Sequence, residues 1–169
     1  KGGGYVRRLK DRYPEAEVLG IGVAGITTAR LLESLKKNFL KNGPTKRRSV
    51  DADIYIIDVG RNDFWVDQTP ELTVRNIRRI VSFIRSEVKK FSGVSPLVGV
   101  TTLAPTTRGY ERSFIEEVNS QLLALRSNAI PVYLRMDTLD ISLISYDGLH
   151  PSALGYDALA EIAQDYASH

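Results

Sequence analysis

The segment DGLHP, residues 147–151, places a carboxylate three positions before one of the two histidines of the chain. Within a tight turn, Asp147 can accept a hydrogen bond from one ring nitrogen of His150, which leaves the other nitrogen free to take a proton. Pro151 favours the first position of a helix that follows this turn. In so short a motif taken alone, the aspartate is more often a turn or capping residue and the histidine an ordinary surface residue.

Two other segments place glycine or amide groups where a predicted strand ends. GRND, residues 60–63, follows the apolar run DIYIIDV, so the side-chain amide of Asn62 could donate a hydrogen bond to a developing oxyanion. GVAG, residues 22–25, lies at the junction between the apolar run EVLGIGV, residues 17–23, and the next predicted helix, so the backbone N–H of Gly25 could be a second donor. Each segment taken alone also fits an ordinary polar turn.

The apolar pattern of the chain predicts strands that alternate with helices. Helical spacing predicts helices over residues 5–13, 27–40, 70–91, 110–125 and from 151 towards the C-terminus. Nearly continuous apolar runs predict strands over residues 17–23, 53–59, 96–103 and 130–136. This order indicates an α/β fold, a three-layer α/β/α sandwich around a parallel sheet. Because ligands bind at the carboxyl ends of such strands, the three polar segments should share one rim.

The composition excludes several classes of function. The chain has 169 residues, of which 43% are hydrophobic and 25% are charged, so it suggests one globular domain. A net charge of +3 gives no case for nucleic acid as the main partner, and no apolar run is long enough to span a membrane. The absence of cysteine excludes a thiol nucleophile and a thiolate metal site. A solvated face is predicted for six basic residues, namely Lys36, Lys37, Lys41, Lys46, Arg47 and Arg48.

Taken together, and in their order along the chain (GVAG, GRND, DGLHP), the three segments resemble the conserved blocks of the SGNH hydrolase superfamily, also called GDSL-type esterases and lipases. Gly25 matches the oxyanion glycine of the family, Asn62 its oxyanion asparagine, and Asp147 with His150 its acid and base. The resemblance covers essentially the whole chain. It implies one domain over residues 1–169 with a flavodoxin-like parallel sheet. It also implies hydrolysis of carboxylic esters or thioesters through a serine nucleophile and an acyl-enzyme, without a metal or an organic cofactor.

One block of the family is missing from the sequence. In the family, a Gly-Asp-Ser sequence ends the first strand, which lies between the strands that match residues 17–23 and 53–59. We therefore expect this strand and the nucleophilic serine upstream of Lys1. The serines within the chain are weaker candidates because none follows a sharp strand-to-helix turn; those considered are Ser49, Ser142 and Ser145.

The substrate is expected to be a small-molecule ester, such as an acylated sugar or lipid. Phe64 and Trp65 directly follow GRND and are predicted to line the acyl pocket, although ordinary packing would also suit them. Thr106, in the loop after a predicted strand, is a candidate second wall. Ile144 belongs to an apolar segment that leads into DGLH and suits a short or medium acyl chain. The compartment and the oligomeric state are not indicated.

Two functions from other classes stay open at this point. The first is a catalytically silent relative that binds an acylated sugar or lipid. The second is a nucleotide-binding domain that uses the G-x-G-x-x-G spacing of residues 20–25. An acidic residue that would bind the ribose is missing about 20 positions further on, where the chain has Asn42, Gly43 and Pro44.

Overall fold

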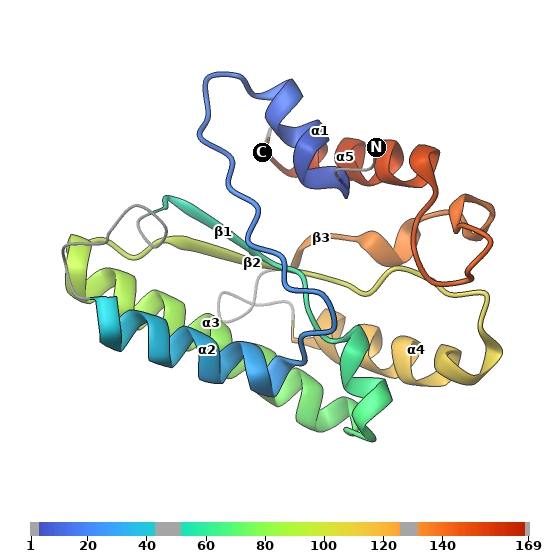
Figure 1. Ribbon diagram of the computed structural model, residues 1–169, viewed down its shortest axis with the longest axis horizontal. Helices are drawn as coiled ribbons and strands as arrows, with labels where there is room; N and C mark the ends of the chain where they lie inside the picture. Colours follow the sequence, from blue (N-terminus) through green and yellow to red (C-terminus); the bar gives the residue numbers. More distant parts are fainter. Residues whose placement is uncertain (1–3, 43–51, 126–131, 168–169) are drawn as a thin grey trace.

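Three parallel strands form the centre of the fold, in the spatial order β1-β2-β3 (Figure 1). They are β1 (Ile54–Ile57), β2 (Leu97–Thr101) and β3 (Val132–Leu134). This description comes from a computed structural model and covers residues 4–42, 52–125 and 132–167. The carboxyl ends of the strands lead into residues 58–66, 102–108 and 135–152, so these segments meet at one rim of the sheet.

Helices cover both faces of this sheet (Figure 1). One layer contains α2 (Thr28–Asn42), α3 (Pro70–Ser92) and α4 (Gly109–Ala124). The other layer contains α1 (Gly4–Arg12) and α5 (Ala153–Ala167), which pack against each other. Among the described residues, α3 packs on β2 and α5 packs on β3. The predicted α/β fold, with three layers around a parallel sheet, is confirmed.

The apolar stripe of α3 is a large part of the core on its side of the sheet. Its residues at helical spacing are buried in the same cluster as Val98 and Val100 of β2; they are Val74, Ile77, Val81, Ile84 and Val88. Burial of each such side chain contributes about 1.5–3 kcal/mol. The hydroxyl of Thr69 accepts a hydrogen bond from the N–H of Leu72, and Gly93 ends the helix with a positive φ of 78°. The helix predicted over residues 70–91 is confirmed.

A second apolar cluster lies between β3, α1 and α5. It contains Leu9, Leu134, Met136 and Leu159. The hydroxyl of Tyr5 on α1 donates a hydrogen bond to Asp58, directly after β1, at 3.3 Å. Burial raises the pKa of the Tyr5 phenol, and the neighbouring Asp58 carboxylate raises it further, so the hydroxyl keeps its proton and remains a donor. This contact ties α1 to the strand that precedes the GRND turn.

The strand predicted over residues 17–23 is wrong. Leu19, Ile21 and Val23 have exposed fractions of 51%, 72% and 59%, and no described strand pairs with this segment. A strand needs a neighbour for its backbone N–H and C=O groups, so an apolar run alone does not make one. The finding also removes the strand that a dinucleotide fingerprint over residues 20–25 requires.

Smaller differences concern the ends of elements. The last helix begins at Ala153 rather than at Pro151, and the described strands are shorter than the apolar runs that predicted them. Residues 130 and 131 of the fourth predicted strand lie outside the described residues, as do Lys46, Arg47, Arg48 and Ser49. Within the described part of the chain, no helix has the length and apolar character needed to cross a bilayer.

One buried amide supports the loop after β2. The side chain of Asn119 on α4 accepts a hydrogen bond from the N–H of Leu103 at 2.7 Å and donates one to its C=O at 2.9 Å. We expect Asn119→Ala to lower the free energy of unfolding by about 2–4 kcal/mol, because two buried backbone groups lose their partner. Urea unfolding measures this. Ser120→Ala, at an exposed position of the same helix, should stay within about 0.5 kcal/mol, and an equal effect in both variants would contradict the prediction.

Candidate active site

The GRND turn leaves β1 through a glycine that no other residue could replace without strain. Gly60 has a φ of 131°, and a Cβ atom there would lie 3.3 Å from the side chain of Thr73. A short 3-10 helix, η2 (Arg61–Val66), follows at once. It directs Asn62 towards the Gly25 turn and buries Asp63 completely.

The Asp63 carboxylate joins the GRND turn to the start of α2. One oxygen accepts the backbone N–H of Thr28 at 2.8 Å, and the other accepts the Thr28 hydroxyl at 2.6 Å. The side-chain amide of Gln68 donates to the second oxygen at 2.6 Å. Because α2 begins at Thr28, these bonds fix the position of the preceding turn, which contains Gly25.

The two predicted oxyanion donors are therefore neighbours. The amide nitrogen of Asn62 donates to the backbone C=O of Ile26 at 3.1 Å, which leaves its second N–H for another acceptor. Gly25 is exposed, with a positive φ of 72° and open space where a Cβ atom would lie. Its own N–H donates to no described residue. Both donors lie beside the carboxyl end of β1.

The Asp147–His150 turn closes on one carboxylate. Oδ2 of Asp147 lies 2.7 Å from Nδ1 of His150. Oδ1 accepts the backbone N–H groups of Leu149 and His150 at 2.8 and 2.9 Å, and the hydroxyl of Ser145 at 2.8 Å. The hydrogen bond from the imidazole has the largest effect and those from the backbone N–H groups come next; together they hold the pKa of Asp147 far below its usual range. The ionised carboxylate thus orients the ring, and Nε2 is left on a side chain that is 64% exposed.

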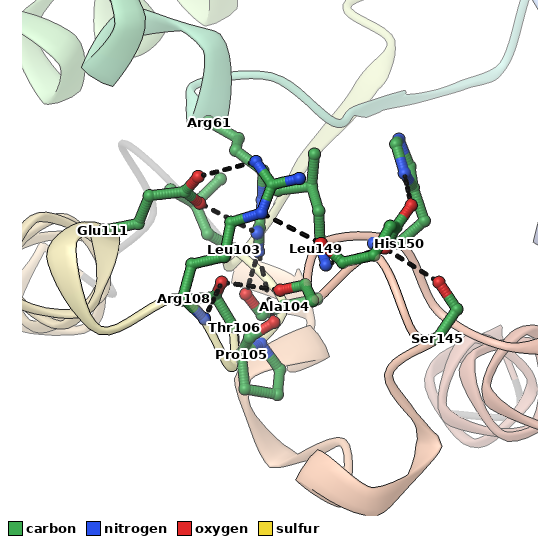
Figure 2. A network of polar contacts seen from close by, with 12 residues as sticks. Arg61, Leu103, Ala104, Pro105, Thr106, Arg108, Glu111, Ser145, Leu149 and His150 are labelled. Carbon is green, nitrogen blue, oxygen red and sulfur yellow. Dashed lines mark hydrogen bonds and ion pairs between the residues drawn. The ribbon is translucent and has the colours of Figure 1, made fainter.

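The loop after β2 holds this turn in place (Figure 2). The hydroxyl of Thr106 donates to the C=O of Gly148 at 2.8 Å, and the N–H of Thr107 donates to the same oxygen at 3.1 Å. Nε of Arg108 donates to the C=O of Asp147 at 3.0 Å. Gly148 has a φ of 74°, and a Cβ atom there would lie 2.6 Å from the Thr107 hydroxyl. The Thr106 side chain is buried and supports the turn, while its predicted contact with substrate stays a prediction.

The aromatic residues after GRND lie against the start of α4. The Phe64 ring is 6.0 Å from Tyr110 and 5.6 Å from Phe114 between centroids, so it is packed on the core. Trp65 is 52% exposed, 5.9 Å from Tyr110, with the Arg108 guanidinium 5.9 Å from its ring centroid. Trp65 and Tyr110 thus offer apolar surface at the rim, whereas Ile144 is buried in the cluster between β3, α1 and α5.

The serines within the chain take different positions. Ser145 donates its hydroxyl to Asp147, on the same turn as the imidazole. Ser142 is exposed, and its backbone N–H donates to the side chain of Asp140. Ser49 lies outside the described residues.

Two further features bear on what the site can hold. Among residues 4–42, 52–125 and 132–167, no group of three or more His, Cys, Asp or Glu side chains is arranged to hold a metal ion. A groove of about 410 Å³ lies between α2 and α3 and contains none of the site residues; it is lined by Leu32, Lys36, Arg75, Arg78, Arg79, Ser82 and Phe83. Its lining includes no histidine or carboxylate that could activate the Ser82 hydroxyl as a nucleophile.

Sequence analysis missed the two buried acids of the rim. Asp63 was considered only as a turn residue, although it contacts a helix 35 positions earlier in the chain. Glu111 was overlooked, although it lies three and seven positions before the buried residues Phe114 and Val118. An acidic residue at helical spacing on an apolar face is the signal that could have identified it.

Comparison with known families identifies the family of the chain. The chain matches the profile of the GDSL-like Lipase/Acylhydrolase family over residues 1–158. The chain belongs to this family. Membership makes it an ester hydrolase. A comparison with curated proteins finds no match.

Solved structures share the fold of this GDSL-like hydrolase at low sequence identity. A lipolytic protein of the G-D-S-L family from Desulfitobacterium hafniense is 19% identical, with a TM-score of 0.72, and the match covers 96% of this chain and 87% of that chain. The psychrotrophic esterase EstA from Pseudoalteromonas is 16% identical, with a TM-score of 0.68 and coverage of 98% and 86%. A GDSL-like lipase from Bacteroides thetaiotaomicron is 20% identical, with a TM-score of 0.66 and coverage of 97% and 82%.

Loss of the buried Asp63 carboxylate should destabilise the hydrolase. In Asp63→Asn an amide NH₂ group would meet the donors of Thr28 and Gln68, so we expect the free energy of unfolding to fall by about 2–4 kcal/mol. Chemical denaturation measures the change. Asp67→Asn, on the same turn but exposed and tolerant of its positive φ, should stay within about 0.5 kcal/mol. A stable Asp63→Asn protein would show that this carboxylate does not hold the turn.

The Asp147 carboxylate should give stability a defined pH dependence. Because the pKa of Asp147 is lowered in the folded state, its ionised form stabilises the fold at pH values above about 4, the ordinary aspartate range. That contribution is lost as the pH falls towards the lowered pKa. The Tm of Asp147→Asn should therefore be lower than that of the parent protein at pH 7, and the difference in Tm should shrink below about pH 4. A difference that grows on acidification would contradict the assignment.

Proposed function

We propose that the protein is a serine esterase that cleaves a carboxylic ester or thioester of a small or medium acyl group through an acyl-enzyme. The observation that carries the proposal is the Asp147–His150 contact of 2.7 Å, with Nε2 left on an exposed ring at the rim that also holds Asn62 and Gly25. A base held by a carboxylate beside two free N–H donors is what acyl transfer requires.

His150 moves the proton in both halves of the reaction. Nδ1 is occupied by Asp147, so Nε2 takes the proton of the serine hydroxyl as the oxygen attacks the ester carbonyl carbon. The imidazolium then gives this proton to the leaving alcohol, and the acyl group stays on the serine. Water repeats the sequence and releases the acid, with Asp147 stabilising the positive ring at each stage.

Gly25 and Asn62 stabilise the oxyanion of both tetrahedral intermediates. The backbone N–H of Gly25 and the second amide hydrogen of Asn62 are two donors at this end of β1 that have no acceptor among the described residues. They belong to segments joined by the Asp63–Thr28 bonds, so they are preorganised before substrate binds.

The nucleophile in this proposal is a serine upstream of Lys1, on a strand beside β1. Two rows of apolar side chains support that place for a strand. Ile54 and Ile56 are exposed on β1, which is an edge strand among the described residues, and Leu19, Ile21 and Val23 are exposed on the segment of residues 17–23. A strand between them would pair the β1 edge and cover both rows.

The substrate in this proposal is a small-molecule ester, such as an acylated sugar or lipid. Phe64 and Trp65 line the acyl pocket, with Trp65 offering the exposed surface. The turn that carries His150 forms the opposite wall, and Thr106 and Ile144 support it from behind. Thr106 donates a hydrogen bond to the C=O of Gly148, and Ile144 forms an antiparallel backbone bridge with Pro151.

Substitution of the base and of one oxyanion donor tests this mechanism. In full-length protein, His150→Ala should reduce kcat for p-nitrophenyl acetate by roughly 10³-fold or more, and Asn62→Ala by about 10²–10³-fold. His169→Ala, which removes the other histidine, should leave kcat unchanged. Labelling by a fluorophosphonate reports the serine. Hydrolysis by His150→Ala at the parental rate would exclude the mechanism, and failure to label would favour a silent domain that binds an acylated sugar or lipid.

A further inference from the structure

A buried carboxylate lies between two arginines at the centre of the rim (Figure 2). Glu111, in the first turn of α4, is 1% exposed. Its Oε2 lies 3.6 Å from Nη1 of Arg61, and its Oε1 lies 3.4 Å from Nη1 of Arg108. The two arginines come from different loops, one after β1 and one after β2.

Each arginine also binds the backbone of a segment that carries a proposed catalytic group or its support. Arg61 directly precedes Asn62, and its Nη2 donates to the C=O groups of Ala104 and Pro105. Arg108 donates from Nε to the C=O of Asp147 at 3.0 Å. A continuous set of contacts thus runs from the Asn62 turn through Glu111 to the Asp147–His150 turn.

Stability alone does not explain this arrangement. Nη1 of Arg61 and Oε2 of Glu111 are buried and have no hydrogen-bond partner among the described residues. Burial lowers the pKa of Arg61, with Glu111 acting in the opposite direction, so the ionised pair is retained against a desolvation penalty. Apolar residues of similar volume usually stabilise such a position at least as well. Buried ionic groups of this kind are useful where they fix one relative position of two segments.

We propose that Arg61, Arg108 and Glu111 are positioning residues that set the separation between the Asn62 amide and the His150 imidazole. This inference rests on the proposed esterase function. None of the three contacts reacting atoms in this scheme; they act through the turns that they bind. Catalytic groups must be held within about 0.5 Å of their productive geometry, so slack in this set of contacts lowers the rate of acyl transfer.

The first test changes Arg108, because its side chain is partly exposed and the variant should fold. Arg108→Lys keeps a positive charge near Glu111 but removes the Nε donor to the Asp147 C=O. We expect kcat for p-nitrophenyl acetate to fall roughly 10- to 100-fold, with KM within about twofold and the thermal midpoint nearly unchanged. A purely structural role would lower the thermal midpoint and leave the kcat of the folded fraction unchanged.

The second test changes Glu111 and measures coupling. Glu111→Gln removes the shared charge and should lower kcat in the same way; if it does not fold, Arg108→Lys decides the question. Matched controls lie on the exposed side of the same helix, where Arg112→Lys and Glu116→Gln should keep the parental kcat. In an Asn62→Ala background, the loss caused by Arg108→Lys should shrink, because one of the two positioned groups is gone.

The outcomes separate this inference from the proposed function. If His150→Ala abolishes activity while Arg108→Lys, and Glu111→Gln where it folds, keep the parental kcat, the positioning role is overturned and the esterase mechanism stands. Full additivity of Arg108→Lys with Asn62→Ala also overturns it. If His150→Ala keeps the parental activity, the proposed mechanism fails, and the positioning role fails with it.

Discussion

The buried carboxylate of Asp63 is the constraint on which the rim depends. It binds both the backbone and the side chain of Thr28, so the end of β1 and the start of α2 cannot move independently. A charged group without exposed surface tolerates no alternative arrangement that leaves it unpaired, because desolvation without compensation is costly. The position of Gly25 beside Asn62 follows from this requirement together with the hydrogen bond from the Asn62 amide to the C=O of Ile26.

The rim is therefore held by polar contacts, whereas the helical layers are held by apolar ones. The stripe of α3 buries side chains of ordinary type against β2 and would tolerate many substitutions that conserve volume. Hydrogen bonds and ion pairs have narrower geometric limits. Asp63, Glu111 and Asn119 each connect a loop at the carboxyl edge to a second element, so the least tolerant contacts are concentrated where catalysis requires precision.

The sequence predicted the features that depend on local patterns. The apolar stripe of α3 and the contact between Asp147 and His150 both follow from spacings of three or four residues. The strand over residues 17–23 was wrong because its formation depends on a partner, which local apolar character does not reveal. The burial of Glu111 has a local signal in its helical spacing, but its pairing with Arg61 was missed because the two residues lie 50 positions apart.

This division between local and long-range contacts has a consequence for catalysis. The proposed acid and base belong to one turn, closed by four hydrogen bonds to a single carboxylate, so their position relative to each other depends mainly on local contacts. In the proposed mechanism, Gly25 and Asn62, which are 37 positions apart, must both face the substrate carbonyl that is attacked beside His150. In the proposed mechanism, a substitution in the contacts between the loops shifts the oxyanion donors and the turn of the base relative to each other. The expected sensitivity of turnover to distant packing therefore lies in this relative position, and not in the contact between Asp147 and His150 itself.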